Sequence, residues 1–193
     1  LAGDGLDLRH LARPILDELV AQTGETAILT AYDNHEVVCI EKVETNHPVR
    51  MTLHVGTRRP PHAGASSKVL MAYLPEEEIQ AIIRGRGLPQ LCVNTITDPE
   101  ALREELARIR SQGYAESHEE TDLGAWGVAT PIFDQDGRVV AAIGVAGPRS
   151  RHTPERSRAS VRLCCDAANR ISSLLGATVG SQACAGREAE AVS

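Results

Sequence analysis

The sequence predicts an α+β domain built around a mostly antiparallel sheet, with helices packed on it and covering one face. Segments with the two-residue period of strands fall into two blocks, and segments with helical periodicity lie between and outside them. Short polar turns at 33–35 and 134–137 join neighbouring strands as hairpins. Because strands and helices do not alternate along the chain, a doubly wound parallel sheet is disfavoured.

The N-terminal part contributes one helix and three strands to this prediction. An apolar stripe over 8–20 predicts an amphipathic helix, in which Pro14 introduces a kink or marks the true start. Strands are predicted over 25–32 and 36–43. A third strand with one buried face is predicted over 49–55, because apolar and polar residues alternate there.

The middle of the chain is predicted to be helical after an irregular loop. Residues 56–67 are rich in Pro and Gly and lead into short helices over 68–74 and 76–84. Thr97 and Glu100 form a capping box that opens a longer amphipathic helix.

The C-terminal part is predicted to return to strands and to close with a helix. The strands cover 114–118, 126–133 and 138–146. The final helix begins at Thr153, which is followed by a proline, and carries an apolar stripe of period near 3.6. The small and polar residues 177–193 are expected to be a flexible tail.

Composition and charge exclude several classes of protein. Hydrophobic residues are 42% and charged residues 24% of the chain, which excludes bulk disorder. The net charge of −6 argues against this chain alone binding a phosphate backbone. No apolar run approaches the roughly 20 residues of a membrane span, and the first residues are no secretory signal. We therefore expect a cytoplasmic protein with no membrane partner.

The cysteines form an odd set that contains no C-x-x-C pair, so neither a disulfide framework nor a zinc site is predicted. We expect all of them to be reduced thiols, mostly in ordinary packing. They are Cys39, Cys92, Cys164, Cys165 and Cys184.

An anion site is predicted where the glycine-rich loop meets the following helix. Ser66 and Ser67 bring hydroxyls and unpaired backbone N–H groups to one point, and Arg58 and Arg59 add positive charge to the same loop. Simple helix capping by these serines is the alternative.

Small residues gather on one face of each of two late strands, where they leave empty volume. Such residues weaken a strand unless a helix or a ligand approaches closely, and the sequence leaves both readings open. The residues are Ala125, Gly127 and Ala129 in one strand and Ala142, Gly144 and Ala146 in the other.

Catalysis is chemically conceivable but poorly supported. Ser66 or Cys92 would act as nucleophile and His62 or His118 as base, with an adjacent glutamate to orient the base. No spacing typical of such a site occurs, and nucleotide-binding and zinc-hydrolase motifs are absent from the sequence. We therefore predict no catalytic residues, no metal and no cofactor.

Three separated strings carry a resemblance to a known family. DLRHLARPILDELVAQTGETA, PPHAGASSKVLMAYLP and GYAESHEETDLGAWGVATPIFDQDGRVVAAIGVAGPRSR resemble the effector-binding domain of IclR-family bacterial transcriptional regulators, in the right order. The resemblance implies a GAF-like (profilin-like) domain with an antiparallel sheet of about six strands. It also implies a winged helix-turn-helix DNA-binding domain before this one, which we expect to be missing from this chain.

On this basis we expect a linker remnant at 1–7, an effector-binding domain at 8–176 and the tail at 177–193. The expected partners are a small-molecule effector, a second copy of the chain in a dimer or tetramer, and DNA only through the missing domain. A small hydrolase with a Ser/His or Cys/His pair is the alternative, and a purely structural dimerisation module is the third option.

The resemblance also implies where the effector binds. Family members that bind very small keto acids tend to have Ser, Cys or Asp at the positions of Ser117, Gly127, Gly144 and Ala146. The residues of this chain widen the pocket and remove polar contacts, so they favour a larger, more apolar carboxylate, for instance an aromatic one. The expected ligand-binding residues, with Ser67 added from the helix start, are Met51, Arg59, Ala65, Ser66, Ser67, Ser117, Ala125, Gly127, Gly144 and Ala146.

Overall fold

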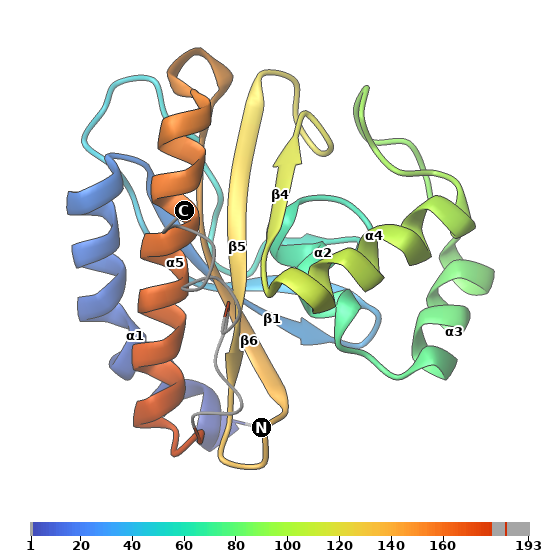
Figure 1. The fold of residues 1–193 in the computed structure, drawn as a ribbon, viewed down its shortest axis with the longest axis horizontal. Helices are drawn as coiled ribbons and strands as arrows, with labels where there is room; N and C mark the ends of the chain where they lie inside the picture. Colours follow the sequence, from blue (N-terminus) through green and yellow to red (C-terminus); the bar gives the residue numbers. More distant parts are fainter. Residues whose placement is uncertain (1, 179–183, 185–193) are drawn as a thin grey trace, which may run out of the picture.

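The computed structural model describes residues 2–178 and residue 184, and it contains one curled antiparallel sheet (Figure 1). The six strands lie in the order β3-β2-β1-β6-β5-β4. The predicted α+β class and the predicted six-stranded sheet are confirmed. The strands are β1 Thr26–Asp33, β2 Glu36–Val43, β3 Arg58–Arg59, β4 Ala115–His118, β5 Ala125–Phe133 and β6 Val139–Pro148.

Helices cover both faces of this sheet, so the prediction of helices on one face is wrong. α1 (Ala2–Thr23) and α5 (Pro154–Leu174) lie side by side against one face, and α2 (Ala65–Ala72) packs on the other (Figure 1). α3 (Glu76–Arg86) and α4 (Pro99–Gln112) extend the layer on the side of α2, and the short 3₁₀ helix η1 is Arg149–Arg151.

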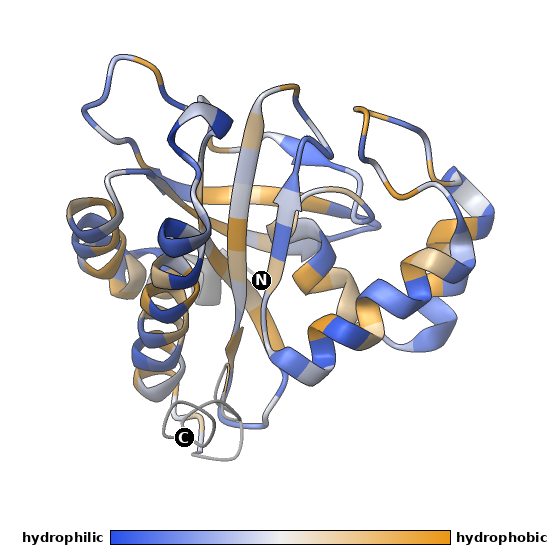
Figure 2. Cartoon of the chain, turned by 45° about the horizontal axis from the view of Figure 1, so that its top comes forward, coloured by the Kyte–Doolittle hydropathy of each residue, from blue (hydrophilic) through white to orange (hydrophobic). Residues whose placement is uncertain are grey.

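The core has two parts, one on each face of the sheet. Trp126, Ile143 and Leu16 belong to the part between the sheet and the pair α1 and α5, while Met71 and Leu106 belong to the part around α2 and α4. Figure 2 shows helices that carry both polar and apolar residues beside mostly apolar central strands. Each fully buried aliphatic side chain stabilises the fold by about 1.5–3 kcal/mol.

The first helix is longer than predicted. It begins at Ala2, so Pro14 lies inside it and does not mark its start. The hairpin of β1 and β2, the hairpin of β5 and β6, and the final helix match the predicted ranges to within one or two residues.

The strand predicted over 49–55 is wrong. This segment is irregular, and the third strand is the two-residue β3, which pairs Val37 with Arg59. Met51 and Leu53 are half-buried because they face a pocket, but Val49 and Val55, which the alternation assigns to the same face, are 65% and 46% exposed. The alternation therefore does not mark a strand with one buried face.

The predicted capping box of α4 is also wrong. The N-cap is Asp98, whose carboxylate accepts a hydrogen bond of 2.8 Å from the Ala101 amide. Pro99 at the first helical position has its φ preset for a helix, and this places the cap one residue after Thr97. The predicted cap of α5 at Thr153 is confirmed.

The expectation that all cysteines are reduced is contradicted. Cys165 in α5 forms a disulfide with Cys184, while Cys39, Cys92 and Cys164 are free. The two cysteines are 19 residues apart and belong to no motif, so the sequence gives no sign of this pairing. The disulfide forms because the fold brings Cys184 back to α5. The rest of the predicted tail beyond 178 lies outside the described residues. None of the described helices is long and apolar enough to cross a membrane.

Candidate ligand-binding site

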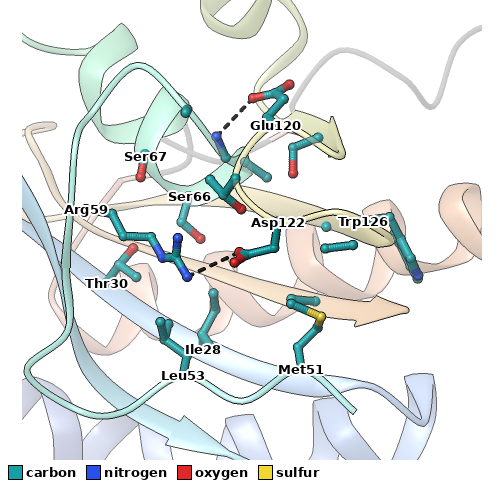
Figure 3. A pocket seen from close by; sticks show the side chains of 18 of the residues that line it. Ile28, Thr30, Met51, Leu53, Arg59, Ser66, Ser67, Glu120, Asp122 and Trp126 are labelled. Carbon is teal, nitrogen blue, oxygen red and sulfur yellow. Dashed lines mark hydrogen bonds and ion pairs between the residues drawn. The ribbon is translucent and has the colours of Figure 1, made fainter. Parts of the chain in front are cut away.

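A pocket lies between the sheet and the start of α2 (Figure 3). Strands β1, β5 and β6 form its floor, and the irregular segment 51–57 and the loop 119–122 form its sides. Its cavity volume is about 100 Å³, and it opens to solvent. Mostly apolar walls with a few polar groups are the usual composition of a small-molecule site.

The structure brings nine of the ten predicted ligand-binding residues together around this pocket. They come from six separate segments of the chain, so only the fold brings them together. They are Met51, Arg59, Ala65, Ser66, Ser67, Ser117, Ala125, Gly127 and Ala146.

Gly144 is the predicted residue that does not line the pocket. A Cβ atom at this position would lie 2.2 Å from the Val128 carbonyl oxygen and 2.9 Å from the Ala129 Cβ. The glycine therefore permits close approach of β5 to β6 and leaves no room there for a ligand.

The small residues of β5 and β6 serve two purposes on one face. Gly127 pairs with Ala146 at the pocket end of the strands. Ala129 and Ala142 lie farther along, where they belong to the core around α2. Both readings of the small-residue pattern thus apply, a ligand pocket at one end and a packed helix at the other.

The start of α2 presents unpaired backbone donors to the pocket. Gly64 precedes the helix with a φ of 90°, no side chain caps it, and its first turn contains no acidic residue. Ser66 and Ser67 are 9% and 5% exposed and line the pocket. Backbone N–H groups in a first helical turn have no acceptor within the helix, so this end suits an anion.

A buried ion cluster holds the start of α2 in place. Lys68 Nζ lies 2.6 Å from Glu120 Oε1 and 2.8 Å from Glu105 Oε1. The other oxygen of Glu120 accepts a hydrogen bond of 2.9 Å from the Gly64 amide. Burial raises the pKa of Glu105, but the hydrogen bond to Lys68 and nearby positive charge lower it more, so this pKa ends below its ordinary value.

Sequence reasoning did not single out Lys68, although a signal was present. It is followed by the apolar run 69–72 on a helix where every residue is buried. A lysine is almost never fully buried unless it is paired, so a lysine in such a run indicates buried carboxylate partners.

Arg59 and Asp122 form an ion pair at the pocket. Arg59 Nη2 lies 3.2 Å from Asp122 Oδ2, and the two side chains are 33% and 43% exposed (Figure 3). Both residues line the pocket. Arg59 was predicted from its place in the loop and from the resemblance, whereas Arg58, predicted with it, lies outside the pocket lining. Nothing in the sequence pattern distinguished Asp122 from its acidic neighbours.

The candidate catalytic residues do not assemble into a site. His62 is buried, its Nε2 lies 2.9 Å from the Pro89 carbonyl oxygen, and burial lowers its pKa. His118 packs its ring against the ring of His152, with centroids 4.7 Å apart. Within the described residues, no hydrogen bond joins Ser66 or Cys92 to either histidine, and no group of His, Cys, Asp or Glu could hold a metal ion.

A pocket with apolar walls and a few polar groups, set on one face of a sheet, is typical of a domain that binds a small molecule. Residues 2–173 match the family model described as bacterial transcriptional regulator IclR C-terminal, so the chain belongs to the IclR family. The resemblance noted in the sequence is confirmed, and nothing supports the hydrolase alternative.

Curated relatives agree with this assignment. The chain is 35% identical to the HTH-type transcriptional regulator KipR of Bacillus subtilis, over 92% of this chain and 71% of KipR. It is 36% identical to the HTH-type transcriptional repressor AllR of Escherichia coli, over 88% of this chain and 63% of AllR. The chain thus spans about two thirds of the length of these relatives.

Solved structures show the same fold. The Thermotoga maritima IclR is 34% identical with a TM-score of 0.83, over 88% of this chain and 68% of that one. An IclR homolog from Microbacterium hydrocarbonoxydans, solved in complex with 4-hydroxybenzoate, is 29% identical with a TM-score of 0.81, over 89% of this chain and 69% of that one.

Proposed function

We propose that the pocket binds a small-molecule carboxylate effector and that the chain is the effector-sensing and oligomerisation part of a DNA-binding transcriptional regulator. The observation that carries this proposal is the uncapped start of α2, which faces a pocket lined by Arg59. The complex of a relative with 4-hydroxybenzoate supports the carboxylate class.

The effector's carboxylate is proposed to lie at the N–H groups of Ser66 and Ser67. Its body would rest against the surface formed by Ala125, Gly127 and Ala146. A helix start stabilises a bound anion by about 0.3–1 kcal/mol at an exposed site and by up to about 2 kcal/mol at a partly buried one. Apolar contact must therefore supply most of the affinity, which favours a ligand with a sizeable apolar body.

DNA binding is proposed to belong to a further part of the full regulator. The relatives are named as helix-turn-helix regulators, and this chain covers only part of their length. Its net charge of −6 also disfavours direct contact with phosphates. We also propose that the chain self-associates as a dimer or tetramer, because symmetric regulators match palindromic operators. A cytoplasmic location is the last part of the proposal.

The proposed role is sensing without turnover. The pocket offers no paired nucleophile and base among the described residues. An effector would act by binding two conformations of the regulator with different affinity, and such coupling is typically about 1–3 kcal/mol.

The test is binding to the wild-type chain and to an Ala146→Leu variant. A thermal-shift screen of aromatic and aliphatic carboxylates, 4-hydroxybenzoate included, identifies ligands that bind the native state. Calorimetry then gives their affinity. Ala146→Leu places side-chain volume in the pocket and should lower that affinity at least tenfold, equivalent to about 1.4 kcal/mol.

Ala101→Leu is the matched control, because it makes the same change on an exposed face of α4. It should leave the affinity unchanged. If folded Ala146→Leu kept wild-type affinity, the proposed location would be wrong. If no carboxylate bound the wild-type chain, the proposed effector class would be wrong.

A further inference from the structure

The loop at one side of the pocket contains three carboxylates, and each is paired with a different element. Glu119 is paired with Arg149 and accepts a hydrogen bond from the Gly124 amide. Glu120 is bound by Lys68. Asp122 is paired with Arg59.

Only the last of these pairs has both members in the pocket lining. Lys68 and Arg149 lie outside it. Arg59 is the basic residue of the lining that the structure describes, and Asp122 Oδ2 lies 3.2 Å from its guanidinium. The charge best suited to attract a carboxylate effector is therefore already neutralised by the protein itself.

We propose that Asp122 is a specificity-determining residue that competes with the effector for Arg59. Its carboxylate lies next to the guanidinium, so an effector whose carboxylate binds at the start of α2 and also contacts Arg59 must displace Asp122 from that contact. This inference rests on the proposed function. Breaking the Arg59–Asp122 pair costs free energy when an anionic ligand binds, whereas a neutral ligand of the same shape leaves the pair intact.

Asp122 is suited to this role because its pairing is easily broken. Its side chain is 43% exposed, so water replaces Arg59 around the released carboxylate at little cost. Leu123, which follows it, is 81% exposed, so the segment lies at the surface. Glu120 differs, because it is 7% exposed and holds both Lys68 and the Gly64 amide.

The experiment compares the full chain with an Asp122→Asn variant, using two probes of nearly equal shape. The probes are 4-hydroxybenzoate, which carries the carboxylate, and 4-hydroxybenzamide, which is neutral. We expect Asp122→Asn to lower the Kd for the benzoate about threefold to fivefold, the size expected of one exposed ion pair. The preference for benzoate over benzamide should rise by the same factor and shrink at high salt.

Asp33→Asn is the matched control. Asp33 is also about half-exposed and pairs at 2.5 Å with the neighbouring Arg58, which lies outside the pocket lining. This variant removes the same charge from the chain, so it should change the preference between the probes by less than twofold.

The outcomes separate this inference from the proposed function. If the wild-type chain binds the benzoate and Asp122→Asn binds it no more tightly, the inference is wrong while the proposed function stands. If Asp33→Asn produces the same gain, net charge and not Asp122 is responsible, and the inference is wrong. If neither chain binds either probe, the proposed function is contradicted for these ligands and the inference is contradicted with it.

Discussion

Lys68 Nζ lies 2.6 Å from Glu120 Oε1, and both side chains are buried, at 2% and 9% exposure. The second oxygen of Glu120 binds the Gly64 amide, directly before α2. One buried ion pair therefore connects the loop at the side of the pocket to the helix start that we propose as the anion site.

Lys68→Met should destabilise the domain strongly. It leaves Glu105 and Glu120 buried without their cation, and breaking a buried pair in this way costs about 3–5 kcal/mol. Urea unfolding measures the loss. Arg170→Met, which breaks the exposed pair with Glu18, should cost no more than about 1 kcal/mol. Similar losses in the two variants would contradict the role given to Lys68.

Gly144→Ala should lower stability by about 1–3 kcal/mol, because the added methyl group overpacks the contact with β5. Gly85 in α3 has open space around it, so Gly85→Ala should instead stabilise the chain by up to about 1 kcal/mol. Chemical denaturation of both variants decides the point. A neutral Gly144→Ala would show that β5 and β6 separate more easily than the structure indicates.

His62 should make the domain less stable as the pH falls. Burial lowers the pKa of this imidazole in the folded state, while the unfolded chain takes up the proton near pH 6.5. The unfolded state then binds more protons, so stability is complete above about pH 6.5 and declines as the pH falls through the lowered pKa.

The measurement is the unfolding free energy at pH 7.5 and at pH 5.5 for the wild-type chain and for His62→Gln. The variant cannot titrate at this position, so its loss between the two pH values should be smaller. Equal losses would show that His62 does not carry this dependence.

The cysteine pairing predicts a specific labelling pattern. Alkylation of the denatured, unreduced chain should modify Cys39, Cys92 and Cys164 only. Reduction should make Cys165 and Cys184 available as well. Mass spectrometry counts the labels, and five labels before reduction would show that the bond does not form.

Local patterns predicted the elements whose own residues determine them. The hairpin turns and the apolar stripe of α5 depend on neighbours within a few residues, so their positions could be read directly. The same logic failed over 49–55, where the partial burial of Met51 and Leu53 depends on a pocket formed by distant segments. It also failed for Cys165 and Cys184, whose pairing depends on where the chain returns.

In the candidate site, too, local features could be predicted from the sequence and tertiary ones could not. Ser66 and Ser67 were predictable because a glycine-rich loop before a helix is a local feature. Gly144 was assigned to the pocket from a shared face, but the register that places it beside Ala129 is a tertiary property. Asp122 became distinct only when folding brought it to Arg59.

The most direct test of the central claim is an NMR titration of the ¹⁵N-labelled chain with 4-hydroxybenzoate. If the carboxylate binds at the start of α2, the amide resonances of Ala65, Ser66 and Ser67 should shift together and saturate with one Kd. Amides of α3, which lies outside the pocket lining, should remain in place. Saturable binding that leaves the three α2 amides unshifted would contradict the claim.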